Sequence, residues 1–188
     1  MRDTRNELLI QAETLVRGRG WSGFSYADLA EAVGIRKASI HHHFRTKDDL
    51  GAALVAAYGE RYDAALAAIC ATHPTGIDRI AAYGKLYLGG VEQGLGCLCA
   101  ALATEGDALP ERLRSDVVAF FAHHISWLEQ VFRDGAADGS IGAGLDPASH
   151  ARLVVATLEG ALLLERLLGG PEAFAGTLTA LTDRLRSR

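Results

Sequence analysis

The sequence predicts an all-α protein of about nine helices, with a three-helix N-terminal head followed by a C-terminal helical bundle. Apolar residues recur at helical spacing along nearly the whole chain, and no stretch of alternating β-branched residues predicts a strand. Three of the four prolines, Pro110, Pro147 and Pro171, stand where a helix is expected to begin, which is the helical position that best tolerates proline.

The head consists of short helices separated by glycine-containing turns. A first helix is expected over 3–18. Ser25, followed three residues later by Asp28, has the pattern of an N-cap with an acidic partner, and it predicts a second helix that ends at Gly34. A short third helix is expected over 37–44. This helix, tight turn and second short helix have the spacing of a helix-turn-helix.

The rest of the chain is expected to form longer helices. The fourth, over 47–70, is preceded by the candidate N-cap Thr46 and would span roughly 36 Å. This length suffices to run from the head into a second domain, so we divide the chain into a helix-turn-helix domain at 1–46 and a second domain at 47–188. Further helices are predicted over 78–93, 96–105, 110–133, 147–168 and 171–186, the fourth of these capped by Asp146.

Length and composition fit a folded protein and exclude other classes. Of the 188 residues, 49% are hydrophobic and 22% are charged, which is sufficient to bury a core and too apolar for a disordered chain. No apolar run approaches the roughly 18–20 residues that cross a bilayer, and the N-terminus lacks the apolar core of a signal peptide. We therefore expect a cytoplasmic protein that makes no membrane contact.

Charge and cysteine content add further expectations. The net charge is −4, but residues 1–50 hold eight Lys/Arg against seven Asp/Glu, and a local cluster of basic groups is enough to attract an acidic partner. Three cysteines, an odd number, predict no disulfide framework. The histidines and cysteines form no recognised catalytic arrangement, so we expect neither enzyme activity nor a cofactor.

The segment 30–50 carries a specific motif. It begins with Ala-Glu-Ala-Val-Gly-Ile and continues with the pair His43-Phe44, then Lys47 and Leu50 in register. Over about 45 residues this region closely resembles the DNA-binding head of the TetR family of bacterial transcription repressors. The resemblance implies a DNA-binding helix-turn-helix joined to a helical domain that dimerises and senses a ligand.

The resemblance also implies roles for nine residues of the head. The N-terminal residues of a recognition helix meet base edges in the major groove, while other side chains and helix N-termini hold phosphates. His41 stands where the family usually has tyrosine, but an imidazole can still donate a hydrogen bond to a phosphate. For each charged residue, the alternative is a solvated surface charge. The base-edge candidates are Arg36, Lys37, Ala38 and Ser39, and the phosphate or groove-wall candidates are Ser25, Tyr26, His41, His42 and Lys47.

Three consecutive histidines at 41–43 raise the question of a metal site. Consecutive residues on a helix point about 100° apart, so three in a row cannot converge on one ion. We therefore expect no metal there.

A looser resemblance covers the predicted helix 96–105. The run Gly-Cys-Leu-Cys-Ala, followed by Glu105 and Leu109-Pro110, is similar to a segment of some TetR-like repressors that respond to small reactive or carbonyl-bearing compounds. A helix N-terminus can lower the pKa of a nearby thiol. Cys97 or Cys99 is therefore either a sensor thiol or a small buried core residue.

A ligand site is expected among the later helices, because helical bundles bind ligands between facing helices. His124 lies on the apolar stripe of its predicted helix, and Glu159 interrupts an otherwise apolar helix. For each candidate the alternative is a purely structural role in the core. The candidates for contacting a small, largely hydrophobic ligand are Tyr83, Tyr87, Cys97, Phe120, His124, Trp127 and Glu159.

The last two predicted helices carry more apolar surface than one bundle needs. The family resemblance implies that two such helices pair with those of a second copy, which suits two recognition helices about 34–36 Å apart on a palindromic site. The candidate homodimer-interface residues are Leu153, Thr157, Gly160, Ala161, Leu164, Leu178 and Leu181.

Together these observations predict a sequence-specific transcriptional regulator, a dimeric repressor of a palindromic operator in double-stranded DNA that a small ligand releases. Four alternatives remain open: a metal-responsive repressor that uses His123, His124, His150 or the cysteines, a thiol-responsive repressor, an architectural DNA binder without a ligand, and a helical enzyme, which is the least favoured.

Overall fold

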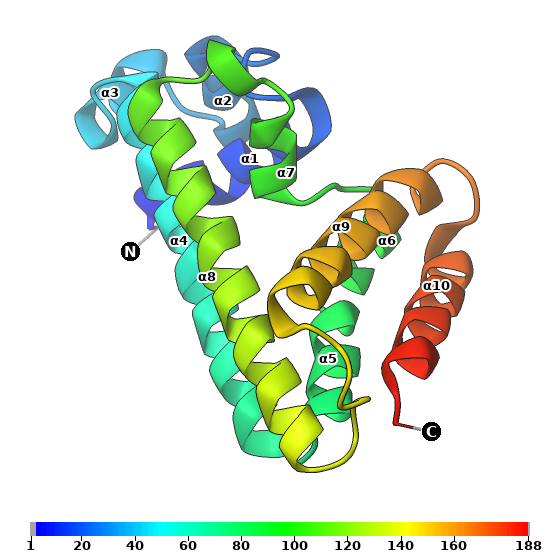
Figure 1. The fold of residues 1–188 in the computed structure, drawn as a ribbon. Helices are drawn as coiled ribbons and strands as arrows, with labels where there is room; N and C mark the ends of the chain where they lie inside the picture. The colour runs from blue at the N-terminus through cyan, green and yellow to red at the C-terminus, as the bar shows by residue number, and fades with distance from the viewer. Residues whose placement is uncertain (1–2, 188) are drawn as a thin grey trace. The chain divides into compact units, whose positions relative to one another are not determined.

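The computed structural model describes residues 3–187, which fold almost entirely into helices (Figure 1). Ten α-helices and a short 3-10 helix occur in this range, and its β-type pairing is limited to an isolated bridge between Ile141 and Arg186. The predicted all-α class is confirmed. No helix within 3–187 combines the length and apolar character that a membrane span requires. The elements are α1 (Thr4–Arg19), α2 (Tyr26–Val33), α3 (Lys37–His43), α4 (Lys47–Thr72), α5 (Gly76–Lys85), α6 (Leu88–Glu92), α7 (Leu98–Ala103), η1 (Gly106–Ala108), α8 (Glu111–Ala137), α9 (Pro147–Glu165) and α10 (Gly170–Leu185).

Two compact units divide the chain. The first combines the residues up to Arg61 with Leu98–Phe120, and the second combines Tyr62–Cys97 with the residues from Phe121 onward. Helices α4 and α8 each begin in the first unit and end in the second. The unit that contains the head therefore also takes in α7 and the beginning of α8, whereas the functional division at residue 46 stays a prediction.

Side-chain caps begin several of the helices. In each case a side-chain oxygen accepts a hydrogen bond from a backbone N–H of the first turn, which the helix itself cannot pair. Ser25 and Asp28 form the predicted reciprocal capping box of α2, and Thr46 and Asp49 cap each other's backbone N–H groups at the start of α4, at 3.1 and 3.0 Å. The other side-chain N-caps are Asp3 for α1, Thr75 for α5 and Asp146 for α9.

The first unit has a core in which α7 joins the head. Helix α1 packs against α2 and α7, and α2 packs against α3. Leu8, Leu29, Ile40 and Leu102, one from each of these four helices, have no exposed surface. The fully buried position of Leu102 shows that a segment far along the chain completes the core of the N-terminal head.

The second unit depends on close helix approaches at glycines. Helix α10 packs against α9, α5 and α6. A β-carbon at Gly84 of α5 would lie 2.2 Å from the Leu178 side chain of α10. Only glycine at this position therefore leaves room for the leucine. Near the start of α5, a β-carbon at Gly76 would lie 2.5 Å from the backbone Cα of Gly135 in α8. These two helices therefore meet backbone to backbone.

The single helix predicted over 78–93 is broken, and this part of the prediction is wrong. Helix α5 ends at Lys85 and α6 begins at Leu88, with Leu86 and Tyr87 forming tighter bonds to residues three positions back, at 3.1 and 3.2 Å. Three glycines lie around the break, and each weakens a helix by roughly 1 kcal/mol relative to alanine. The packing of α6 against α9 and α10 then determines its separate direction.

We expect Gly76→Ala to destabilise the protein by roughly 1–3 kcal/mol, because the new methyl group meets backbone atoms that cannot rotate away. Thermal unfolding followed by circular dichroism should show a melting temperature lower by about 2–4 °C per kcal/mol. The matched control is Gly59→Ala in α4, where a β-carbon has no neighbour within 4 Å. That variant should melt at the same or a higher temperature, and equal losses for both variants would contradict the close approach of α5 and α8.

Candidate DNA interface and ligand site

The helix-turn-helix is formed by α2, a tight turn and α3. Gly34 ends α2 in the left-handed conformation, at φ 72°, where a β-carbon would be strained. Across the turn the Ile35 N–H donates to the Ala30 carbonyl at 3.0 Å. Ile40 and Phe44 are buried and anchor α3 from its inner side. These buried contacts determine which residues of α3 face outward.

Six of the nine predicted DNA-contacting residues lie at the start of α3 or along its exposed side. Ser25 is also exposed, and its hydroxyl donates to Asp28 Oδ2 at 2.5 Å in the cap of α2. The His41 Nδ1 lies 3.1 Å from the Arg45 carbonyl oxygen, so this interaction orients the imidazole. The structure therefore groups most of the predicted residues on one accessible helix. The six exposed positions are Arg36, Lys37, Ala38, Ser39, His41 and His42.

Tyr26 has its partners inside the head. Its side chain is buried, and its hydroxyl donates to the carbonyl oxygen of Thr46 at 2.5 Å and lies 3.2 Å from that of Phe44. Burial, followed by the charges of Asp49 and Asp48, raises the pKa of Tyr26 to about 12. The hydroxyl that is predicted to contact phosphate thus fixes the end of α3 to the start of α4, and its contact with DNA stays a prediction.

Lys47 is likewise turned inward. Its ammonium donates to the carbonyl oxygens of Trp21 and Phe24, the latter at 2.6 Å, and lies 4.6 and 4.1 Å from the centroids of their rings. Burial lowers the pKa of Lys47, although nearby carboxylates, above all that of Glu105, oppose this effect. The group predicted to bind phosphate holds the loop between α1 and α2 through hydrogen bonds and cation–π contacts, and its contact with phosphate stays a prediction.

Glu105 holds the same loop by accepting hydrogen bonds from the N–H groups of the loop. The sequence did not predict this role. Its carboxylate accepts hydrogen bonds from the Ser22 N–H at 3.0 and 3.1 Å and from the Ser22 hydroxyl at 2.5 Å. Burial raises the pKa of Glu105, but hydrogen bonds from Ser22 and Trp21 and the charge of Lys47 lower it overall. We call residues 20–24 with Lys47 and Glu105 the loop clasp. An acidic residue after α7 is the one sequence signal for it.

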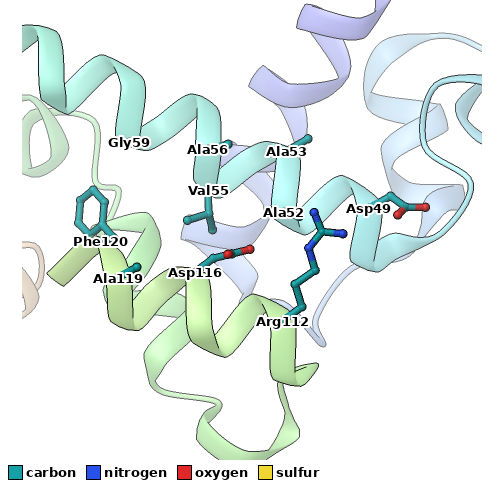
Figure 2. A pocket seen from close by; sticks show the side chains of 10 residues that line it. All are labelled: Asp49, Ala52, Ala53, Val55, Ala56, Gly59, Arg112, Asp116, Ala119 and Phe120. Atoms are coloured by element: carbon teal, nitrogen blue, oxygen red, sulfur yellow. The ribbon is translucent and has the colours of Figure 1, made fainter. Parts of the chain in front are cut away.

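A groove of about 470 Å³ lies between α4 and the beginning of α8 within the first unit. Small residues of α4 form one wall, and Figure 2 shows Arg112 extending from α8 toward that helix, with Phe120 farther along α8. Phe120, predicted to line a ligand site with the tyrosines, lies here, and its ring is 5.5 Å from that of Tyr58. The lining residues are Asp49, Ala52, Ala53, Val55, Ala56, Gly59, Arg112, Asp116, Ala119 and Phe120.

The other six predicted ligand residues lie in the second unit, where contacts connect them. The Tyr83 hydroxyl lies 3.2 Å from that of Tyr87 and 3.1 Å from His124 Nδ1. The Trp127 ring is 5.6 Å from the Tyr83 ring. Tyr87 and Cys97 hydrogen-bond the carboxyl group of Glu159. We call these residues the tyrosine–glutamate cluster: Tyr83, Tyr87, Cys97, His124, Trp127 and Glu159.

Burial governs the protonation of this cluster. It raises the pKa of Glu159 to about 7, although hydrogen bonds from Cys97 and Tyr87 oppose the shift. It also lowers the pKa of His124 to about 4, with a smaller contribution from the charge of His123. The pKa values of both tyrosines are raised, chiefly by burial. At neutral pH, the carboxyl group of Glu159 is therefore close to the midpoint of its ionisation, whereas His124 and the two tyrosines are neutral.

The predicted interface residues divide into outward and inward groups. Leu153 and Leu164 of α9 are 52% and 54% exposed, which leaves them available to a partner. Ala161 and Leu178 are buried within their own protomer, so their prediction as interface surface is corrected: the helical stripe continues around into the core. Thr157, Gly160 and Leu181 are half-buried.

The cysteines and histidines form no metal centre in the described range. Cys97 and Cys99 are buried and Cys70 is exposed. Within residues 3–187, no group of three or more His, Cys, Asp or Glu side chains is placed to hold a metal ion. His123 is instead paired with Asp63 at 2.9 Å.

Known families and proteins resemble both parts of the chain. The family model described as "Bacterial regulatory proteins, tetR family" matches residues 8–54, and "Tetracyclin repressor-like, C-terminal domain" matches residues 76–181. The transcriptional regulator AcuR of Cereibacter sphaeroides is 30% identical over 156 residues, which cover 79% of this chain and 70% of AcuR. The HTH-type transcriptional repressor NemR of Escherichia coli K12 is 28% identical over 169 residues, which cover 88% of this chain and 85% of NemR. A crystal structure of a TetR family regulator from Agrobacterium tumefaciens has a TM-score of 0.93 and 32% identity, covering 98% of each chain.

These matches fall on the structural features described above. The first family model covers the helix-turn-helix with its loop clasp residue Lys47, and the second covers the tyrosine–glutamate cluster and most of α10. Both describe transcription regulators, as do the names of AcuR and NemR. The chain therefore belongs to the TetR family of bacterial regulatory proteins and is a DNA-binding transcriptional regulator.

Proposed function

We propose that the protein is a cytoplasmic, ligand-released repressor that binds a palindromic operator as a homodimer. The observation that carries the DNA-binding part is the run of exposed residues at the start of α3, fixed in place by the buried Ile40 and Phe44. Such a helix start fits the major groove, where Arg and Lys most often contact guanine. We assign base contacts to Arg36, Lys37, Ala38 and Ser39, and phosphate or groove-wall contacts to Ser25, His41 and His42.

We assign a positioning role to Lys47 and Tyr26. Their polar atoms are engaged by backbone carbonyl groups on either side of α2 and α3. Tyr26 has a single hydroxyl proton, so a contact with phosphate would require it to leave these partners at a free-energy cost, and two of the three N–H donors of Lys47 are already held by carbonyl groups. Both residues therefore serve DNA binding by fixing the orientation of the recognition helix.

The exposed face of α9 supports the dimer. Leu163, Leu167 and Leu168 are 62%, 83% and 78% exposed, and they extend the outward stripe that contains Leu153 and Leu164. A continuous apolar stripe of this kind is unfavourable in water and is characteristic of an interface. We propose that a second copy covers it, together with Thr157, Gly160 and Leu181. This pairing would set the separation of two recognition helices.

The tyrosine–glutamate cluster supports a ligand site in the second unit. Its aromatic rings and few polar atoms are typical of small-molecule sites. A ligand that binds one conformation of the dimer more tightly than another shifts the population toward it. We propose that the ligand-bound conformation holds the recognition helices at a spacing that does not match the operator.

We expect Lys37→Ala and Arg36→Ala each to weaken operator binding by roughly 1–3 kcal/mol and to relax sequence preference at one base position per half-site. The measurement is fluorescence anisotropy with the region upstream of the protein's own gene and with scrambled DNA at several salt concentrations. Arg133→Ala, which removes the same charge from the end of α8, is the control and should bind as wild type does. Equal weakening on operator and scrambled DNA would contradict base reading.

Lys47→Met should lower both thermal stability and affinity for every DNA sequence. Loss of the ammonium group leaves the carbonyl groups of Trp21 and Phe24 without their donor, at a cost of roughly 1–3 kcal/mol of folding free energy. Lys85→Met, at the exposed end of α5, provides the charge-matched control. An unchanged melting temperature combined with a large loss of DNA affinity would instead assign Lys47 to a phosphate contact.

Leu164→Glu should shift the protein from dimer to monomer, since two like charges would be buried in the proposed interface. Sedimentation velocity over a range of concentrations measures the change. Val118→Glu, at a 63% exposed position of α8 in the first unit, serves as the control and should sediment as wild type does. A Leu164→Glu protein that remains fully dimeric would move the interface away from α9.

A further inference from the structure

The carboxyl group of Glu159 receives hydrogen bonds from the protein, but one of its two oxygens has no partner in the described part of the chain. One of its oxygens, Oε1, is buried and has no hydrogen-bond partner among the residues that the structure describes. The same carboxyl group receives hydrogen bonds from Tyr87 and Cys97. A buried carboxylate oxygen accepts hydrogen bonds strongly and is costly when none is made. A donor from outside the chain would complete this group.

The hydrogen bonds of the cluster form a chain that leads to Glu159. An ionised carboxylate cannot donate, so the Tyr87 hydroxyl proton points to Glu159. The Tyr87 hydroxyl oxygen also lies 3.2 Å from that of Tyr83, which lies 3.1 Å from His124 Nδ1. These neighbours engage the tyrosine hydroxyl groups, and none of them is a hydrogen-bond partner of Oε1, which remains available to a ligand.

The charges near Glu159 bear on the class of ligand that its carboxyl group would accept. Its pKa reflects burial and two neutral hydrogen-bond donors, with no cationic group contributing. Arg166, which follows the last residue of the same helix, donates from Nε to the carbonyl oxygen of Gly94 at 3.0 Å. The elements that pack against α9 carry their acidic and basic residues at exposed positions, namely Glu92, Glu172, Asp183 and Arg184. The cluster is thus complementary to a positive charge.

The aromatic rings favour the same class of ligand. The Tyr83 ring is 5.7 Å from the Tyr87 ring and 5.6 Å from the Trp127 ring. Aromatic faces attract cations, and they also cover the apolar part of an organic molecule. Trp127 and Glu159 are only partly buried, so the cluster reaches the surface of its unit at these residues.

We propose that the tyrosine–glutamate cluster binds a small organic ammonium ion, whose N–H donates to Oε1 of Glu159 and whose apolar part lies against the aromatic rings. This inference rests on the proposed ligand site and names the chemical class of its ligand. The charge and the vacant acceptor of Glu159 select the cation.

Binding of a cation must then be linked to the ionisation of Glu159. Its pKa is about 7, so the carboxyl group is mostly protonated at pH 6 and mostly ionised at pH 8. His124, with a pKa of about 4, stays neutral in this range, and the raised tyrosine pKa values keep both hydroxyl groups protonated. An ammonium ion should therefore bind roughly tenfold more tightly at pH 8 than at pH 6.

The experiment uses three probes of nearly equal shape and different charge, namely benzylamine, benzyl alcohol and benzoate. Isothermal titration calorimetry with the full-length protein measures their dissociation constants at pH 6 and pH 8. Benzylamine remains protonated at both values and should bind most tightly, with the tenfold pH dependence. Benzyl alcohol should bind more weakly and benzoate most weakly.

The Glu159→Gln variant keeps the shape of the side chain and removes its charge. It should bind benzylamine at least tenfold more weakly than wild type at pH 8 and should lose the pH dependence. Glu165→Gln, six residues along α9, is the matched control and should retain both. Benzoate or benzyl alcohol binding as well as benzylamine, wild-type affinity in Glu159→Gln, or no binding of benzylamine would each overturn the proposal.

Operator binding by the same preparations separates this proposal from the proposed function. Specific DNA binding without amine binding would remove the ammonium site and leave the regulator with another ligand. Amine binding with the expected pH dependence, in a protein that does not recognise its operator, would support the site and remove the proposed repressor mechanism.

Discussion

The head depends on a loop, residues 20–24, whose N–H and carbonyl groups are held by two oppositely charged side chains. Glu105 accepts from the N–H side, and Lys47 donates to the carbonyl side. Hydrogen bonds to charged groups are stronger than neutral ones, and partial burial reduces their screening by salt. Because Lys47 opens α4 and Glu105 follows α7, the path of the chain between α1 and α2 is determined by residues outside the first two helices.

Helix α3 is likewise stabilised by contacts with other parts of the head and not by its own sequence alone. It has seven residues and no side-chain cap, and isolated helices shorter than about 12–15 residues are marginal in water. Buried Ile40 and Phe44 and the Tyr26 hydroxyl supply the missing stability from one side. The residues on the outer side contribute little to folding. Their identity is therefore free to follow a requirement other than folding, which is what the proposed base contacts need.

Sequence patterns predicted the helices and caps well because these are local. Ser25 with Asp28, Thr46 and Asp146 each act on the next turn of the chain, and the structure has them in these roles. The inward turn of Lys47 was not predicted, since it depends on a loop that lies 23–26 residues away. Periodicity likewise showed that α9 has a broad apolar stripe, but it could not separate buried Ala161 from exposed Leu164. That distinction depends on where α10 packs.

Phe120 shows that residues of one helical stripe can belong to different compact units. On α8, Phe120 contacts Tyr58 of α4 in the first unit, and His124, one turn later, contacts Tyr62 of α4 in the second. Each pair lies within its own unit, with ring centroids 5.5 and 5.2 Å apart. Phe120 and His124 share one stripe of α8, so helical spacing alone could not tell that they belong to different units.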